Sequence, residues 1–430
     1  MEPADAKPRK FGAVTPWLAL LAISLLINYI DRGNLSLAAP LLKNELQLTA
    51  WQLGILFSAF FWTYTALQFG MGWVVDRFEV NHVIAAGFLV WSLATAATGL
   101  VQGFAMLLLM RLVLGLGESV AFPSCSKILA LHVAEPDRGF ANGVIIAGMK
   151  SGPAVGALGA GLLMERYGWR PVFIGIGLVS LLWLAAWKKW MPRGPALVAA
   201  QAGAQAAVPT VARIFRQRSF WGACAGHFSA NYLLYFMVTW LPFYLVHERQ
   251  LSVHSMAVTA SVYYLVDAVS AIGTGWFSDF WIRRGLTPTR VRKSAMLIGH
   301  TTAALALAGC ALAGPHTYLA WLLVAGVGSG MSGSGIYAFC QILAGPKAAG
   351  RWTGFQNGFA NVAGVAAPAL TGFMVNRTGN FQIALAITGA VSLAGGLAWV
   401  FAIGPLQEAS WAGDHPVLPG AAVYPDKLNY

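Results

Sequence analysis

Charged residues are scarce in this chain of 430 residues. They make up only 10% of the sequence, whereas an average soluble domain contains roughly 25%. Hydrophobic residues account for 57%, so a water-soluble fold of this size would lack charge for its surface. The composition therefore excludes an ordinary soluble protein and favours one embedded in a lipid bilayer.

Cysteine is rare, and the motifs of nucleotide chemistry are missing. The four cysteines lie singly in apolar segments, without the spacing of a disulfide framework or a metal site. Gly328-x-Gly330-x-x-Gly333 matches the dinucleotide fingerprint by its letters, but it lies inside an apolar span and no strand precedes it. A Walker loop and a nucleophile arrangement are also absent. We expect no metal, no cofactor and no enzyme activity.

Long apolar stretches dominate the sequence instead. A membrane-spanning helix needs about 20 apolar residues to cross about 30 Å of hydrocarbon. We place twelve such spans near 17–40, 51–74, 82–102, 104–130, 140–163, 171–190, 220–246, 256–277, 294–314, 317–344, 354–375 and 381–403. They are too long and continuous for barrel strands. The predicted fold class is therefore an all-α polytopic membrane protein.

The net charge of +12 has an uneven distribution along the chain. If the N-terminus is cytoplasmic, 19 of the 28 Lys and Arg residues fall on the cytoplasmic side of the predicted spans. Clusters near 188–193, 213–218 and 283–293 contribute most of them. The basic balance thus indicates topology and not nucleic-acid binding. We expect a multi-pass protein of a bacterial inner membrane with both termini in the cytoplasm.

The longest interruption between spans divides the chain into two groups of six helices. Two motifs recur at an offset of 203 residues, namely Asn28-Tyr29-Ile30 as Asn231-Tyr232-Leu233 and Gly72-Trp73 with Asp76 as Gly275-Trp276 with Asp279. Further matches follow in the same order at slightly larger offsets, including Gly115 and Gly117 with Gly328 and Gly330. We predict a cytoplasmic tail (1–16), a six-helix half (17–190), a cytoplasmic linker (191–219), a second half (220–403) and a cytoplasmic tail (404–430). Two such pseudo-symmetric halves around a central path are typical of a transporter.

Three segments carry a family resemblance: Asn28-Tyr29-Ile30-Asp31-Arg32-Gly33-Asn34-Leu35-Ser36, Trp240-Leu241-Pro242-Phe243-Tyr244-Leu245 and the run from Leu343 to Trp352. By these the chain resembles the major facilitator superfamily, and more narrowly its anion:cation symporter family of galactonate, glucarate, hexuronate and aromatic-acid carriers. The loop with Gly72, Asp76 and Arg77 is similar to part of the superfamily's gating motif, with Glu79 in place of a small residue.

Four charged residues lie where charge is expensive, inside predicted spans: Asp31, Arg32, Arg111 and Glu118. An ionisable side chain at bilayer depth costs about 2.5–3.5 kcal/mol, which favours a functional role over static packing. The resemblance implies that Asp31 and Glu118 are protonation sites, that Asp31 pairs with Arg111, and that Arg32 holds the substrate carboxylate. Burial disfavours the charged form of a carboxylate and a nearby arginine favours it, so an arriving anion can release a carboxylate to take a proton.

Uncharged candidates for substrate contacts lie in both halves. Tyr29 and Tyr64 can donate hydroxyls in the first half, and the resemblance implies substrate contact for Tyr64. In the second half the candidates are Gln356, Asn357, Asn361 and Tyr232, with Tyr235 and Trp240 as weaker ones. The same side chains also occur as ordinary helix packing or as polar contacts between helices.

Lys150 is an unexpected cation, because sugar-acid carriers of this type tend to have an uncharged polar side chain there. As a second cation it would favour a dicarboxylate or an aromatic acid, but a lysine can also extend away from the cavity. Asp267 is the acidic residue predicted to be buried in the second half. It is a candidate for one of two roles, a further proton site or a structural partner of another group.

The leading hypothesis is proton-coupled uptake, by alternating access, of a small organic carboxylate such as a hexonate, hexuronate or aldarate. Aromatic or dicarboxylic acids form one alternative, and export of cationic compounds or ligand sensing without flux are others. Buried cations outnumber buried acids in the first half, which favours anions over cations. The expected partners are the organic anion, protons and the bilayer, with no nucleic acid and a single chain sufficient for function.

Overall fold

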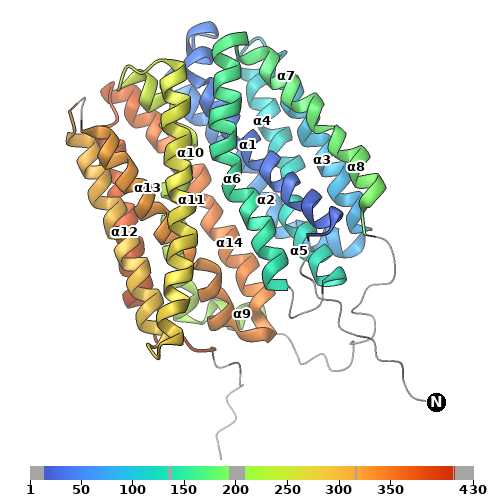
Figure 1. Cartoon of the computed structure of the whole chain (residues 1–430), viewed down its shortest axis with the longest axis vertical. Helices are drawn as coiled ribbons and strands as arrows, with labels where there is room; N and C mark the ends of the chain where they lie inside the picture. Colours follow the sequence, from blue (N-terminus) through green and yellow to red (C-terminus); the bar gives the residue numbers. More distant parts are fainter. Residues whose placement is uncertain (1–13, 134–137, 193–208, 315–316, 410, 412–430) are drawn as a thin grey trace, which may run out of the picture.

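A computed structural model describes residues 14–133, 138–192, 209–314, 317–409 and 411 (Figure 1). Within these ranges all regular secondary structure is helical. The first half contains α1 (Pro16–Glu45), α2 (Ala50–Arg77), α3 (Val80–Thr98), α4 (Phe104–Glu118), α5 (Ala121–His132), α6 (Arg138–Tyr167), α7 (Trp169–Ser180) and α8 (Leu182–Trp190). The second half contains α9 (Val211–Phe215), α10 (Arg218–His247), α11 (Val253–Arg283), α12 (Pro288–Leu312), α13 (Tyr318–Ser334), α14 (Ile336–Thr378), α15 (Gln382–Leu397) and a π-helical turn (Ala398–Ala402).

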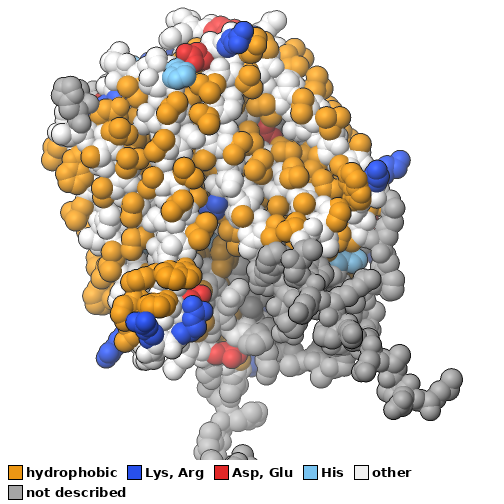
Figure 2. All heavy atoms as spheres, viewed as in Figure 1, with side chains coloured by type: hydrophobic (Ala, Val, Ile, Leu, Met, Phe, Trp, Pro, Cys, Tyr) orange, Lys and Arg blue, Asp and Glu red, His pale blue; other side chains and the backbone are white. Residues whose placement is uncertain are grey.

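Eleven helical spans of the described residues are long and apolar enough to cross a membrane. Four of them join two elements, since α4 continues into α5, α7 into α8, α13 into the first part of α14, and α15 into the π-helical turn. The remaining predicted span, 220–246, corresponds to α10, whose 30 residues suffice in length although Tyr, Trp, Asn and His lower its hydropathy. Figure 2 shows a broad band of hydrophobic side chains across the middle of the molecule and basic side chains toward its ends. The all-α polytopic fold is confirmed.

Local sequence signals explain where several spans begin. Thr49 precedes α2 and forms a capping box with Gln52, in which the Thr49 Oγ1 accepts from the Gln52 amide at 3.1 Å and the Thr49 amide donates to the Gln52 side chain at 2.9 Å. Ser252 and Thr287 cap α11 and α12 in the same manner, by accepting a backbone amide. Such caps satisfy amides that have no partner inside the helix.

Gly345 separates two spans that form one continuous element, α14. Its φ of 62° lies in the left-handed region, which glycine adopts without the steric penalty of a side chain. The chain reverses direction there, so residues before Gly345 complete one span with α13 and those from Gly350 to Thr378 form the next. The C-terminal segment packs against this turn, with the Ala409 amide donating to the Leu343 carbonyl at 2.9 Å.

The internal repeat appears in the packing of each half. Gly117 of α4 lies against the carbonyl of Gly87 in α3, and Gly328 of α13 lies against the carbonyl of Gly299 in α12. The third and fourth spans of each half therefore approach each other at equivalent glycines, as expected for two copies of one six-helix unit.

The two halves join at the end that carries the α1–α2 and α10–α11 loops, which we call the closed end. A hydrophobic cluster there unites side chains of both halves, including Leu42 and Leu53 with Trp240 and Phe381. Toward α9 the buried side chains form separate clusters, one belonging to the second half alone and one mainly to the first. Figure 1 shows α6 and α11 converging at the closed end and separating toward α9. The halves are thus separated along α6 and α11 at the α9 end, whereas Phe69 of α2 contacts Phe355 and Phe359 of α14 with ring centres 6.3 and 6.4 Å apart.

Candidate functional site

A buried ion pair lies at the centre of the molecule. The Arg32 Nε of α1 donates to Glu118 Oε2 of α4 at 2.8 Å, with exposed fractions of 5% and 0% for the two residues. Arg32 Nη2 and Glu118 Oε1 have no hydrogen-bond partner among the described residues. Since buried polar atoms are nearly always paired in native proteins, these two have spare capacity for a ligand.

Aromatic rings surround the Arg32 guanidinium. Its Cζ lies 4.5 Å from the ring centre of Tyr64, 4.6 Å from that of Tyr29 and 5.1 Å from that of Phe60. Tyr64 also stacks on Phe60 with ring centres 5.2 Å apart. Each such contact stabilises a cation by about 0.5–2 kcal/mol. The rings fix the guanidinium while leaving it positively charged, as an anion anchor requires.

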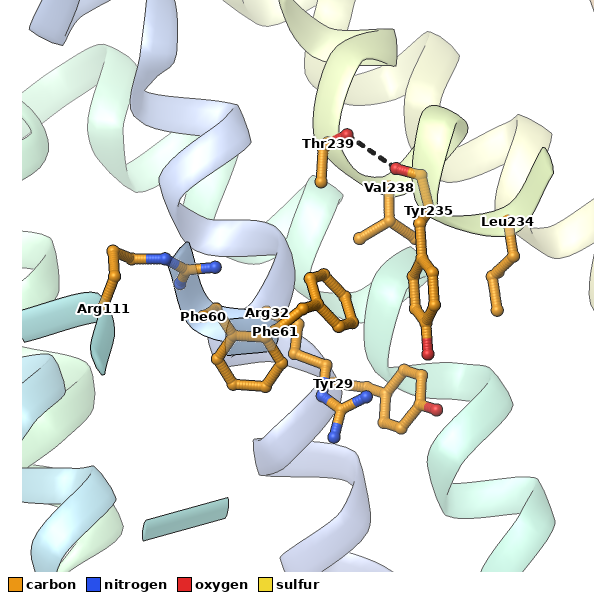
Figure 3. Close-up of a pocket in the computed structure, with 9 residues that line it drawn as sticks. All are labelled: Tyr29, Arg32, Phe60, Phe61, Arg111, Leu234, Tyr235, Val238 and Thr239. Carbon is orange, nitrogen blue, oxygen red and sulfur yellow. Dashed lines mark hydrogen bonds between the residues drawn. The ribbon is translucent and has the colours of Figure 1, made fainter. Parts of the chain in front are cut away.

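Arg111 of α4 lies on the other side of Phe60. Its Cζ is 5.1 Å from the Phe60 ring centre, and its Nε donates to the Leu56 carbonyl of α2 at 3.2 Å. Figure 3 shows that Arg111 and Arg32 line one small pocket between the halves. The other lining residues are Tyr29, Phe60, Phe61, Leu234, Tyr235, Val238 and Thr239. Two guanidinium groups therefore give this pocket a positive lining.

The predicted contact between Asp31 and Arg111 is not among the ion pairs of the described residues. Asp31 Oδ1 instead accepts from Asn34 Nδ2 at 3.2 Å, one turn along α1. Adjacent helical residues diverge by about 100°, so only one of Asp31 and Arg32 can face Glu118, and it is Arg32. Arg111 donates its Nε to a backbone carbonyl, and the carboxylate in direct contact with a site arginine is Glu118, on Arg32.

The second half contributes neutral hydrogen-bonding groups to the site. Tyr235 of α10 donates its hydroxyl to Asn361 Oδ1 of α14 at 2.5 Å, and Asn361 Nδ2 donates to the Asn357 carbonyl at 2.8 Å. The Tyr235 ring lies 4.3 Å from that of Phe61 of α2, which brings the two halves into contact. Asn357 and Asn361 thus lie behind Tyr235, as a support for its hydroxyl.

A fourth tyrosine, Tyr337 of α14, lies near the phenols of Tyr29, Tyr64 and Tyr235. Its ring centre lies 6.1 Å from that of His227 of α10, and the residue is 41% exposed. Tyr337 was not predicted as a site residue, because a single tyrosine in an apolar span has no distinguishing signal in the sequence.

Two of the predicted contact residues lie elsewhere. Gln356 is fully buried inside the second half, where its Oε1 accepts from Trp352 Nε1 at 2.9 Å and its Nε2 lies 3.3 Å from His227 Nδ1. Tyr232 packs in a hydrophobic cluster next to Phe228, with ring centres 6.1 Å apart. Both side chains have structural surroundings, so the amide and phenol functions of the site come from Asn361 and Tyr235 instead.

Lys150 and Asp267 form a second ion pair, partly buried and between the halves. Lys150 Nζ of α6 lies 3.2 Å from Asp267 Oδ2 of α11, with side-chain exposed fractions of 26% and 9%.

The predicted gating motif lies far from both pairs, at the α9 end of α2. A Cβ atom added at Gly72 would have no neighbour within 4 Å, and Arg77 is exposed, whereas the Asp76 side chain lies outside the described residues.

Chemically, the site holds a cation whose counter-ion can be exchanged. An incoming carboxylate can take the place of Glu118 beside Arg32, and hydroxyl groups of the same molecule can bond the tyrosines. Phe60, Phe61 and Tyr337 were missed by sequence reasoning. The spacing of Phe60 and Tyr64, one turn apart on the same face as a candidate residue, is the signal that could have found the first of them.

Comparisons with known proteins show the family of the chain and agree with its fold. A family model described as "Major Facilitator Superfamily" matches residues 21–368. The chain is 28% identical to the hexuronate transporter of Bacillus subtilis (strain 168) over 94% of its length and 98% of the relative's. It is 30% identical to a protein of Cupriavidus necator named "Probable sulfoacetate transporter SauU", over 90% and 93% of the two lengths. The crystal structure of a bacterial homolog of the human lysosomal transporter Spinster, inward-facing and occupied, matches with a TM-score of 0.68 at 18% identity, covering 91% of this chain and 95% of its own.

Proposed function

The chain belongs to the major facilitator superfamily, and from this premise we propose that it takes up a small organic carboxylate, such as a sugar acid, together with protons. The curated relatives include proteins named as hexuronate and D-galactonate transporters, which supports this substrate class. The observation that carries the proposal is the buried Arg32–Glu118 ion pair beside a pocket between the halves.

Exchange of the Arg32 counter-ion would couple the two fluxes. When the substrate carboxylate binds Arg32, Glu118 loses its positive partner inside a low-dielectric site, where its charged form is disfavoured. Glu118 then takes a proton, and the neutral side chain no longer competes for Arg32. Asp31, buried on the same helix and bonded only by Asn34 among the described residues, is our candidate for a second proton.

The membrane potential makes the number of protons important. A potential of 100 mV is worth about 2.3 kcal/mol per charge moved, so a monoanion needs more than one proton before that potential drives its import. Two titratable carboxylates, Glu118 and Asp31, meet this requirement. Arg111 lines the same pocket and keeps it positively charged, which favours rebinding of an anion after the carboxylates release their protons.

We place the α9 end in the cytoplasm of a bacterial inner membrane. Arg213, Arg216 and Arg218 lie at that end of the second half, together with Arg283 and Arg284 at the end of α11, which agrees with the excess of basic residues on cytoplasmic sides. The described state then opens to the cytoplasm, and alternating access requires rocking of the halves about the site. Gly72, Asp76 and Arg77 stay our candidates for a gating loop at this end, and a single chain is our expected functional unit.

Tyr29, Tyr64 and Tyr235, with Asn361 and Asn357 behind the last, are our candidates for hydroxyl recognition. Lys150 is a further candidate for contact with the substrate. Export of cationic compounds is disfavoured, because two guanidinium groups line the pocket and repel a cation.

Uptake into proteoliposomes tests the proposal. An imposed inward proton gradient should drive accumulation of at least one labelled acid from a panel of galactonate, glucuronate, galactarate and benzoate. Glu118→Gln should abolish accumulation but keep exchange of internal for external substrate, and Glu408→Gln, at an exposed glutamate after the last span, should behave as wild type. Uptake that does not respond to the proton gradient would refute proton coupling, and so would accumulation that is unchanged in Glu118→Gln. Binding without any uptake would indicate a sensor.

A further inference from the structure

The helices α6 and α11 connect the two halves through a series of antiparallel contacts. From the closed end toward α9 these contacts are Glu165 with His254 (3.2 Å), Gly161 with Ala257, the Ser261 hydroxyl with the Ala154 carbonyl (2.9 Å), and Lys150 with Asp267 (3.2 Å). The ion pair is therefore the contact of this series closest to the point where the helices separate (Figure 1).

The position of this ion pair is unusual for a purely structural contact. Lys150 and Asp267 both lie near the middle of their helices, at the depth where charge is most expensive in a bilayer. Neighbouring contacts on the same two helices are made by small or singly polar residues, such as Ala154 and Ser261. Packing alone thus needs no charge here, and a charge retained at this depth indicates a role toward a ligand.

The α6 segment that carries Lys150 packs against one of the site tyrosines. Two residues after Lys150, a Cβ atom added at Gly152 would lie 2.6 Å from the Tyr29 Cβ, and the Tyr29 ring contacts Arg32 at 4.6 Å. The Lys150 Nζ lies 3.9 Å from the position that a Cβ atom of Gly333 would occupy at the end of α13. The α6 segment of Lys150 and the Arg32 guanidinium therefore both adjoin Tyr29.

Each of these two cations has a carboxylate counter-ion supplied by the protein. Arg32 has Glu118 from its own half, and Lys150 has Asp267 from the opposite half. An acid with one anionic group can replace only one of these carboxylates. An acid with two anionic groups, separated by a hydroxylated chain that contacts the tyrosines, can replace both.

We propose that Asp267 is a counter-ion which the second anionic group of a substrate displaces from Lys150, so that Lys150 selects acids with two anionic groups over matched monoacids. This inference rests on the proposed function and narrows its substrate class. Binding of such a dianion also replaces a direct link between the halves by a link through the substrate. The contact nearest the point where α6 and α11 separate is then made through the bound substrate.

Galactarate and galactonate form a matched test pair, because they differ by one carboxylate in place of a hydroxymethyl group. Affinities of the purified full-length protein for both acids are measured by calorimetry at one pH and ionic strength. We expect wild type to prefer galactarate and Lys150→Gln to lower that preference by about tenfold or more, since a charge-assisted hydrogen bond is lost. Galactonate affinity, which also reports correct folding, should change less than about twofold.

Three further variants separate selectivity from structure. Asp267→Asn should raise the affinity for galactarate, because Lys150 then has no competing carboxylate, and Lys150→Arg should keep the preference. Lys189→Gln, at the end of α8, and Asp279→Asn, an exposed partner of Arg292 on α11, are the controls and should match wild type. If the ion pair were merely structural, Lys150→Gln and Asp267→Asn would lower the affinity for both acids alike.

The outcomes distinguish this inference from the proposed function. A wild type that binds neither galactonate, galactarate nor any other acid of the uptake panel overturns both. If wild type binds the monoacid but does not prefer galactarate, the role of Lys150 alone is overturned. The same holds if wild type prefers galactarate and Lys150→Gln keeps that preference unchanged. A fall in galactarate affinity in Asp267→Asn equal to that in Lys150→Gln also overturns it, because the displaced counter-ion would then be a required partner.

Discussion

Replacing Glu118 with glutamine removes the charge opposite Arg32 and keeps the shape of the side chain. Removing one partner of a buried ion pair typically costs about 3–5 kcal/mol, because the other charge stays buried. Here the glutamine oxygen can still accept from Arg32 Nε, and the rings of Tyr29, Phe60 and Tyr64 each continue to stabilise the guanidinium. We therefore expect a smaller loss of about 2 kcal/mol in the stability of the ligand-free protein.

The same substitution should strengthen substrate binding. In wild type the substrate carboxylate competes with the Glu118 carboxylate for Arg32, whereas in Glu118→Gln it competes with a neutral amide. The difference between a charged and a neutral competitor corresponds to roughly tenfold in affinity. A bound substrate should therefore raise the melting temperature of Glu118→Gln by more than that of wild type.

The pH dependence gives the sharper result. Protonation of Glu118 frees Arg32, so wild-type affinity should increase as the pH falls, by at most about tenfold per pH unit for one linked proton. Glu118→Gln imitates the protonated side chain and should bind with an affinity independent of pH over the same interval. Calorimetric titrations of wild type, Glu118→Gln and the exposed control Glu408→Gln between pH 5 and 8 measure this. Weaker binding by Glu118→Gln, with the wild-type pH dependence retained, would refute the counter-ion exchange.

Gly54→Val should abolish transport and trap the outward-open state, because a Cβ atom there would lie 3.0 Å from the Gly372 Cα where the halves close. Labelling of introduced cysteines checks it, and Gly159→Val, at an exposed glycine of α6 with open space around an added Cβ, is the control. Tyr235→Phe should raise KM about tenfold with little loss of stability, since the hydroxyl bonded to Asn361 lies at the pocket; initial uptake rates measure it. Gln356→Leu should lower the melting temperature and leave KM unchanged, because its amide bonds only buried groups among the described residues; a thermal-shift assay with uptake rates decides.

Much of the fold followed from the sequence because bilayer physics leaves few choices. Long apolar runs can only be helices in lipid, and the recurrence of Asn28 as Asn231 indicated two related halves. The break within the fourth span was not predicted, although the sequence contains a signal for it. The helix is interrupted between α4 and α5 at Ser119 and Val120, and Pro123 lies four residues after Ser119. Proline has no amide to donate to the Ser119 carbonyl and its ring clashes with that carbonyl, which interrupts the helix there.

The burial of the four charged candidates was predicted from the sequence, whereas the Arg32–Glu118 ion pair was not. Burial of Asp31, Arg32, Arg111 and Glu118 followed from their place in apolar spans, and all four are at most 5% exposed. Which carboxylate faces which arginine depends on the rotation of α1 against α4, and a sequence period of 3.6 residues does not determine the rotation of one helix relative to another. Family resemblance suggested Asp31 with Arg111, whereas the helix rotation brings Arg32 to Glu118.

The distribution of charge between the halves has a mechanistic consequence. Arg32, Arg111 and Glu118 all belong to the first half, whereas the second half offers the site phenol and amide groups from Tyr235 and Asn361. When the halves rock, the substrate can therefore keep its charged anchor and exchange only neutral hydrogen bonds, each worth about 1 kcal/mol. Such a division would keep the barrier between the two open states low at the Arg32 anchor, since Arg32 does not lose its anionic partner during the movement. Substitutions of Arg32, Arg111 or Glu118 should accordingly alter coupling to protons, and those of Tyr235 or Asn361 should alter the choice of substrate.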